Sequence, residues 1–203
     1  IGYASLMIIT LLFLKYQTKS VEPISNFECN NGNVTIIATN NQITLIDPGV
    51  IGRRLSASSW CEYKLMPHLA KRYGTTTIDH LIIMQPNKII FDALYELVDK
   101  ITIGHICIPL WDGKIPERWW YSYSKFKRRC TQNGIKISYL GAKPYILEMG
   151  AQAALTVTPL PQRVSQEDFS YPTFHLQARL GNLNLELHSA KYKQAIPKTQ
   201  KTL

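Results

Sequence analysis

A polar turn after an apolar stretch is the place where this sequence most closely resembles a reactive site. The apolar residues 81–84 (LIIM) run into Gln85, Pro86 and Asn87, and the chain continues with KIIF. This pattern predicts a buried strand, a turn and a helix, where α/β proteins usually place reactive groups. The turn offers two amides and a lysine instead. Zinc needs imidazole, thiolate or carboxylate ligands at about 2.0–2.3 Å, so the turn predicts neither a metal nor an activated water.

The histidines and cysteines form no local ligand pair. The closest two histidines, His68 and His80, are 12 positions apart. We interpret His68, His80 and His105 as structural residues, because buried histidines are usually satisfied by hydrogen bonds. No Cys-x-x-Cys pair occurs, which argues against a zinc ribbon or a redox pair, while disulfide bonds stay open if the domain is extracytoplasmic. The cysteines are Cys29, Cys61, Cys130 and Cys107, and the last is predicted to lie in the core.

Asp47 stands in the sequence Asp47-Pro48-Gly49, for which two roles compete. An aspartate there could act as an acid or a base, but in such a turn its side chain usually bonds the backbone two residues on. We therefore interpret Asp47 and Gly49 as a structural turn. The chain has no Gly-x-Ser-x-Gly elbow and no glycine-rich phosphate loop, which argues against a serine hydrolase.

A basic cluster lies in a predicted helix at residues 117–132. Trp119, Tyr123, Phe126 and Cys130 recur at helical spacing, so we expect them to form its buried stripe. The basic residues then face outward, where they form either a solvated surface or a phosphate-binding patch. No base-reading motif accompanies them, so any binding of nucleic acid is expected to be independent of sequence. The candidate DNA-binding residues are Lys125, Lys127, Arg128 and Arg129.

The elements that must position these residues alternate in type, which predicts an α/β fold with helices on a face of the sheet. Two β-branched runs, 33–38 and 42–46, predict a hairpin at the start of the fold. Alternating leucines on either side of Gly181 predict a second hairpin near the end. Between them we expect helices at 67–73, 91–101 and 117–132, and strands at 79–84, 103–109 and 135–140.

Composition and charge set the outer limits. The chain has 203 residues, 45% of them hydrophobic and 18% charged, which is enough for one good-sized core. Its net charge of +9 favours an anionic partner such as nucleic acid or phospholipid. Residues 1–14 carry no charge and precede Lys15 and Lys19, which predicts attachment to the membrane through the end of a transmembrane helix. A buried N-terminal helix is the alternative.

The order of these pieces resembles the first half of the metallo-β-lactamase αββα sandwich. More narrowly, it is similar to the domain that follows the membrane helices in ComEC-type DNA-uptake proteins of competent bacteria. Residues 28–37 (ECNNGNVTII) stand where that family has an Asp-Val-Gly-Gln-Gly-Asp strand. LIDPG at 45–49 matches its Ile-Asp-x-Gly, MPHL at 66–69 its Pro-Tyr-Leu helix, and IDHL at 78–81 its Leu-Asp-x-Leu strand.

The resemblance implies that a metal site has been lost. The family's Thr-His-x-His-x-Asp-His turn aligns with residues 84–90, where the ligands are replaced. Its bridging Thr-Gly-Asp is also replaced, by the residues around His188, and we find no second βαβ half. We therefore expect no catalytic residue, no metal and no cofactor. The degenerate ligand positions are Gln85, Asn87, Ile89 and Ile90.

The resemblance implies a catalytically inactive domain of a bacterial inner-membrane protein for DNA uptake, placed outside the cytoplasm, that binds DNA or serves as a scaffold. A membrane-anchored interaction domain or a decayed remnant without a DNA role is the alternative, and an active metal-dependent DNA hydrolase is a third. We expect the end of a transmembrane helix at 1–15, a linker at 16–25, the domain, without its second half, at 26–190, and a basic tail at 191–203.

Overall fold

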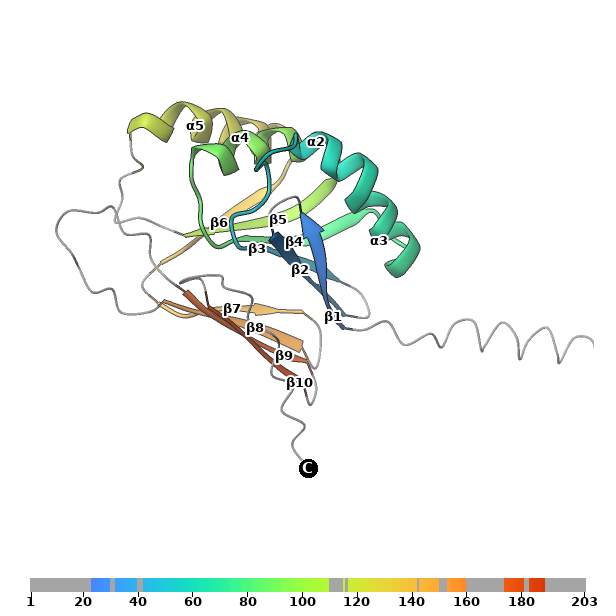
Figure 1. Cartoon of the computed structure of the whole chain (residues 1–203). Helices are drawn as coiled ribbons and strands as arrows, with labels where there is room; N and C mark the ends of the chain where they lie inside the picture. Colours follow the sequence, from blue (N-terminus) through green and yellow to red (C-terminus); the bar gives the residue numbers. More distant parts are fainter. Residues whose placement is uncertain are drawn as a thin grey trace, which may run out of the picture.

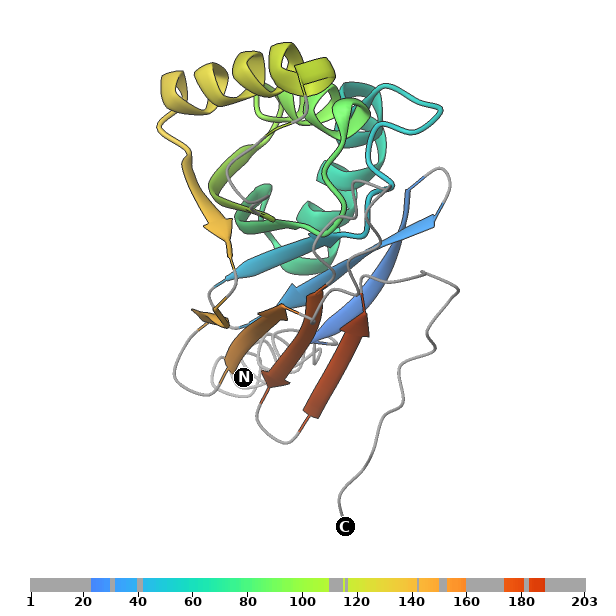
Figure 2. The ribbon, with the colours of Figure 1, turned by 90° about the vertical axis from the view of Figure 1, so that its left-hand side faces the viewer.

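The structure is a computed structural model that describes residues 23–29, 32–39, 42–109, 115, 117–141, 143–149, 153–159, 174–180 and 183–188. Its elements form three layers, with helices on one face of a six-stranded sheet and a four-stranded sheet on the other face (Figure 1). The view turned by 90° shows the same order of layers (Figure 2). The chain is therefore a mixed α/β fold with helices covering one face of a mixed sheet, which agrees with the predicted class.

The six-stranded sheet keeps its strands in chain order. Its antiparallel part consists of β1 (Ile24–Cys29), β2 (Gly32–Ala38) and β3 (Ile43–Asp47). Its parallel part continues from β3 with β4 (Thr77–Ile83), β5 (Thr102–Pro109) and β6 (Lys136–Leu140). The carboxyl ends of β3 to β6 therefore meet at one edge of the sheet, where the turns after β3 and β4 lie.

The helical layer begins with one continuous helical segment. Its parts are α2 (Ala57–Trp60), a π-helical turn η1 (Cys61–Leu65) and α3 (Met66–Tyr73). Gly74 ends α3 with a φ of 70°, the left-handed conformation that glycine adopts without steric cost. The other helices are α4 (Lys88–Leu97) and α5 (Glu117–Gln132), which pack side by side over the parallel strands (Figure 1).

The four-stranded sheet is antiparallel throughout. It contains β7 (Tyr145–Glu148), β8 (Ala153–Pro159), β9 (Phe174–Leu180) and β10 (Leu183–His188). Two apolar cores hold the layers together. The helices and the larger sheet bury Trp60, Phe91 and Phe126, and the two sheets bury Ile82 and Leu155 between them. The side chains in both cores supply the apolar burial that favours folding.

Most predicted elements are confirmed, and α5 has the predicted bounds. The first hairpin does not begin the sheet, because β1 precedes and pairs with it. The helix expected at 91–101 begins at Lys88, where Asn87 caps it, and ends at Leu97. Strands β7 and β8 were not predicted. The predicted transmembrane segment, most of the predicted linker and the basic tail lie outside the described residues, within which no helix is long and apolar enough to cross a membrane.

Candidate functional site

The carboxyl ends of the parallel strands bring the Asp47 turn and the polar turn after β4 together. The Met84 N–H donates to the Asp47 carbonyl oxygen at 2.9 Å. The Asp47 side chain turns back onto its own loop, where Oδ1 accepts the N–H groups of Gly49 at 2.8 Å and Val50 at 2.7 Å. The bond to Gly49 is the one expected of an Asp-Pro-Gly turn. Asp47 thus fixes the loop that leads from the sheet to the helices.

Full burial dominates the electrostatics of Asp47. Burial raises the pKa of its carboxyl group, while the N–H groups of Val50 and Gly49 and the charge of Arg53 act in the opposite direction. Oδ2 is buried and has no hydrogen-bond partner among the described residues. A general acid or base must come within about 3 Å of its substrate, so a carboxyl group enclosed in this way suits a structural role better.

The four degenerate positions occupy structural places beside this loop. Asn87 begins α4, and its Oδ1 accepts the Ile90 N–H at 3.0 Å. Ile90 is fully buried in the core between the helices and the sheet, whereas Ile89 is exposed. Gln85 lies against Gly49, where an added Cβ would come within 3.0 Å of the Gln85 Cβ. Asn87 and Ile90 therefore serve the start of a helix and the core.

Cys29 lies beside the Asp47 loop, where its Sγ donates to the Val50 carbonyl oxygen at 3.9 Å, whereas His68, His80 and His105 lie elsewhere in the fold. His68 stacks on Phe27 with ring centroids 4.3 Å apart, and His80 and His105 are partners across β4 and β5. All four cysteines are buried and free, and Cys107 lies in the core between the sheets as predicted. In the part of the chain that the structure describes, no group of three or more His, Cys, Asp and Glu side chains is arranged to hold a metal ion.

The basic residues of α5 divide into two pairs. Lys125 Nζ lies 4.2 Å from the centroid of the Tyr95 ring on α4. Arg129 Nε lies 3.0 Å from Asp99 Oδ1, and another of its nitrogens donates to the Tyr95 hydroxyl at 3.3 Å. Lys125 and Arg129 therefore do not face outward as predicted, because the Tyr95 ring on α4 and the Asp99 carboxylate in the turn after α4 lie against them.

The other pair, Lys127 and Arg128, is exposed, and neither residue forms an ion pair with another described residue. Trp120 and Tyr121 are also exposed, at 58% and 76%. Each aromatic residue precedes one of the cations by seven positions, which is about two helical turns and places both on the same face. The sequence places Trp120 and Tyr121 in the same helix as the basic cluster, but the predicted basic surface did not include them. The structure separates them from the buried stripe, because they are exposed whereas the neighbouring Trp119 is buried.

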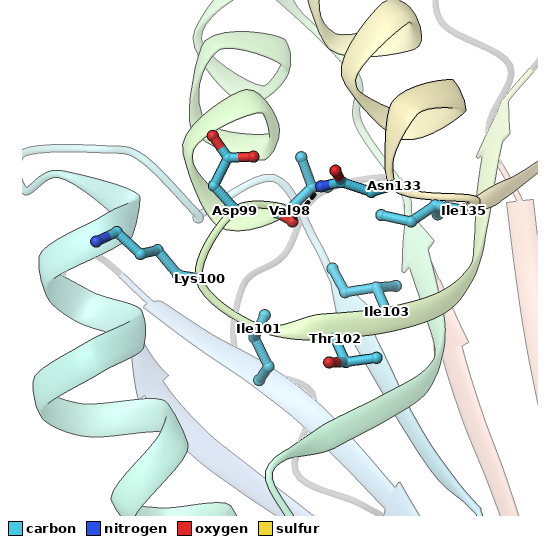
Figure 3. A pocket seen from close by; sticks show the side chains of 8 residues that line it. All are labelled: Val98, Asp99, Lys100, Ile101, Thr102, Ile103, Asn133 and Ile135. Atoms are coloured by element: carbon cyan, nitrogen blue, oxygen red, sulfur yellow. Dashed lines mark hydrogen bonds between the residues drawn. The ribbon is translucent and has the colours of Figure 1, made fainter.

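A pocket of about 340 Å³ lies near the amino ends of β5 and β6, away from the polar turn (Figure 3). Asn133 Nδ2 donates to the Val98 carbonyl oxygen at 2.8 Å in its wall. Asp99 is paired with Arg129, and Lys100 with Glu62 at 2.6 Å. Both charged side chains of the lining therefore already have partners, and we assign this pocket no ligand.

Comparison of the chain with protein-family models and with curated protein sequences gave no match. Its function has to be inferred from its own residues. Two features stand out among those described. They are the turn after β4, which serves the fold, and the exposed aromatic and basic face of α5.

Proposed function

We propose that the protein is a non-hydrolytic, metallo-β-lactamase-like domain of a ComEC-type DNA-uptake membrane protein that binds DNA through one face of α5. The observation that carries the proposal is the turn after β4, in which Asn87 caps α4 and Ile90 fills the core. At the positions aligned with metal ligands, these two side chains serve the fold. Helices over a mixed sheet, with a second sheet behind it, are compatible with such a sandwich.

The DNA-binding face of α5 consists of Trp120, Tyr121, Lys127 and Arg128. Two cations without ion-pair partners among the described residues suit phosphate groups, and phosphate contacts carry no sequence information. Two exposed rings on the same face suit unpaired bases, because every base has a face on which an aromatic ring can stack. The bases of a duplex are already stacked on one another. The proposal therefore favours single-stranded DNA without a preferred sequence.

The test is a salt titration of DNA binding by fluorescence anisotropy, with one labelled oligonucleotide used as a single strand and as a duplex. Affinity should fall log-linearly with salt, and Lys127→Ala with Arg128→Ala should flatten the slope on the single strand by about 1.4, or about 0.7 per phosphate contact. Trp120→Ala with Tyr121→Ala should weaken single-strand binding by about 1–3 kcal/mol per lost stack and leave the slope unchanged.

Lys64→Ala with Lys71→Ala is the matched control, because it removes the same charge from exposed positions outside α5. Equal affinities and slopes for wild type, control and test variants would remove DNA from the proposal. Changing Lys125 and Arg129 in addition should flatten the slope no further, because Tyr95 and Asp99 already bind them. Cleavage of the oligonucleotide by wild-type protein supplied with zinc or manganese would contradict the non-hydrolytic part.

A further inference from the structure

A group of soft and nitrogen donors lies between the two sheets, separate from the turn after β4. The register of the parallel strands places Thr44, His80 and His105 side by side on β3, β4 and β5. The His80 and His105 rings meet edge to face, with centroids 5.6 Å apart. Cys107 follows two positions after His105, and its Sγ lies 3.8 Å from His105 Nε2.

An irregularity in the sheet brings the two histidines to this side. Ile78 pairs with Ile103, and the next paired residues are His80 and His105, so Asp79 and Gly104 separate the two paired stretches. Ile78 and Ile103 face the helices. From His80 and His105 onward the alternation of side chains is reversed, so these two residues face the four-stranded sheet. The histidines therefore share the inter-sheet side with Cys107.

The polar atoms in this group are only partly satisfied. His105 Nε2 lies 2.8 Å from Ser138 Oγ, so one ring nitrogen of His105 has a partner. Both ring nitrogens of His80 are buried, and neither has a hydrogen-bond partner among the described residues. Leaving a buried polar group unpaired costs about 1–3 kcal/mol, so a ligand for His80 would remove a real penalty.

We propose that His80, His105 and Cys107 bind one monovalent copper ion between the sheets. Two imidazoles and a thiolate form a soft, three-coordinate donor set, which suits this ion better than zinc with its four tetrahedral ligands. A nitrogen at about 2.0 Å and a sulfur at about 2.3 Å from one ion lie about 3.8 Å apart in a trigonal arrangement. His105 Nε2 and Cys107 Sγ already have this separation.

A further soft donor lies beside the group. Thr44, the strand partner of His80, donates its hydroxyl to Met149 Sδ at 3.1 Å. The Met149 thioether therefore lies over β3, next to the strand that carries His80. Thioethers, like thiolates, favour monovalent copper over harder ions.

Binding requires three local changes. His105 Nε2 must give up its hydrogen bond with Ser138 Oγ, because the nitrogen lone pair that binds copper is no longer available to the hydroxyl group. The three donors do not surround a common point among the described residues, so the His80 ring must turn toward His105 Nε2 and Cys107 Sγ. This turn breaks no hydrogen bond of the His80 ring nitrogens among the described residues. The Cys107 thiol must also release its proton to solvent as the copper–sulfur bond forms.

The test is an anaerobic titration of the full chain with monovalent copper in competition with the chromogenic chelator bicinchoninate. The wild type should withdraw one equivalent of copper. His80→Asn and Cys107→Ser should each weaken binding by about 100-fold or more. His80 is only partly buried, so His80→Asn is the variant least able to disturb folding, and circular dichroism checks both variants.

His68→Asn and Cys130→Ser are the matched controls, since they remove a histidine and a buried thiol from other parts of the fold. Both should bind copper as the wild type does. The proposal is overturned if the wild type withdraws no copper, or if folded His80→Asn and Cys107→Ser variants compete as the wild type does.

Discussion

Asn87 and Asp47 both bind the backbone at the edge of the sheet where an α/β enzyme would place its chemistry. Asn87 caps the first turn of α4, and Asp47 holds the loop after β3. A helix cap contributes about 1 kcal/mol, so replacing Asn87 by a metal ligand would change the stability of α4 as well as the chemistry of the turn. Single side chains here explain how this edge of the sheet is held.

The buried carboxyl group of Asp47 predicts a pH dependence of stability. Burial raises its pKa in the folded protein, so the unfolded chain releases this proton at lower pH than the folded one. The wild type therefore loses stability relative to Asp47→Asn as the pH rises above the ordinary aspartate value of about 3.9. In urea unfolding experiments from about pH 4 to 7, the free energy of unfolding should shift steadily in favour of Asp47→Asn.

If the free energies of unfolding of the two proteins differ by the same amount at every pH in this range, the Asp47 carboxyl group has an ordinary pKa in the folded protein. Asparagine keeps an oxygen acceptor for the loop. The difference between the two free energies of unfolding therefore reports the loss of the carboxylate, and the change of this difference with pH reports its ionisation. Glu148→Gln, at an exposed position on β7, removes one negative charge from the surface and serves as the control.

At the scale of elements, Gly52 decides how closely the loop after β3 packs on α4. Its φ is +79°, and an added Cβ would lie 2.3 Å from the Cβ of the buried Ala93. Gly52→Ala should therefore cost about 1–2 kcal/mol for the left-handed backbone and about 1–3 kcal/mol more for the overlap. Chemical denaturation of the purified variant measures this loss.

Gly74→Ala is the matched comparison for Gly52→Ala. Gly74 has a φ of +70°, but nothing lies within 4 Å of its added Cβ. Only the backbone cost of about 1–2 kcal/mol should appear there. If both substitutions destabilise the protein equally, the loop does not pack on α4 as closely as the structure has it.

Elements with a strong repeating pattern could be predicted from the sequence, and weakly patterned ones could not. The aromatic stripe of α5 fixes its bounds, because Trp119, Tyr123 and Phe126 recur at helical spacing and are buried. Strand β7 has only four residues, and Leu147 is its one buried side chain. Strand β1 mixes buried and exposed residues without strict alternation. Both strands depend on pairing with neighbours that the local sequence does not reveal.

The candidate sites needed tertiary information for the same reason. Lys125 and Arg129 were expected to face outward, because their partners Tyr95, on α4, and Asp99, in the turn after α4, belong to another part of the chain. Likewise, His80 and His105 are far apart in the sequence, and only the register of two parallel strands makes them neighbours. Spacing along one element predicts which residues share a face, but it does not predict which residues of other elements cover that face.

At the scale of the whole molecule, the outer face of the four-stranded sheet is suited to water. One row across it joins Ile146, Thr156, Gln177 and Glu186, of which only the first is a large apolar residue. A sheet face that packs against helices is mainly apolar, whereas an exposed antiparallel face is mainly polar. The described sheet therefore needs no second helical layer to cover it, although the αββα sandwich proposed for this chain would have one.

Two different means of membrane association were predicted from the sequence, and an experiment can tell them apart. Residues 1–14 form an uncharged apolar run, whose insertion depends on burial in hydrocarbon. The net charge of +9, with Lys127 and Arg128 exposed, favours attraction to anionic headgroups, which salt screens over about 10 Å at 0.1 M. Extraction by salt therefore distinguishes surface attraction from insertion.

We predict that the full chain, expressed in bacteria and fractionated, sediments with membranes, resists a wash in about 1 M salt and is released by detergent, because insertion of residues 1–14 is not electrostatic. A variant that begins at Pro23 lacks this run but keeps every described element, and it should stay in the supernatant at high salt. Any part of it that sediments at low salt should decrease when Lys127 and Arg128 are changed to Ala. A full chain that stays in the detergent-free supernatant would show that residues 1–14 do not insert, and the buried N-terminal helix would then be the better interpretation of the run.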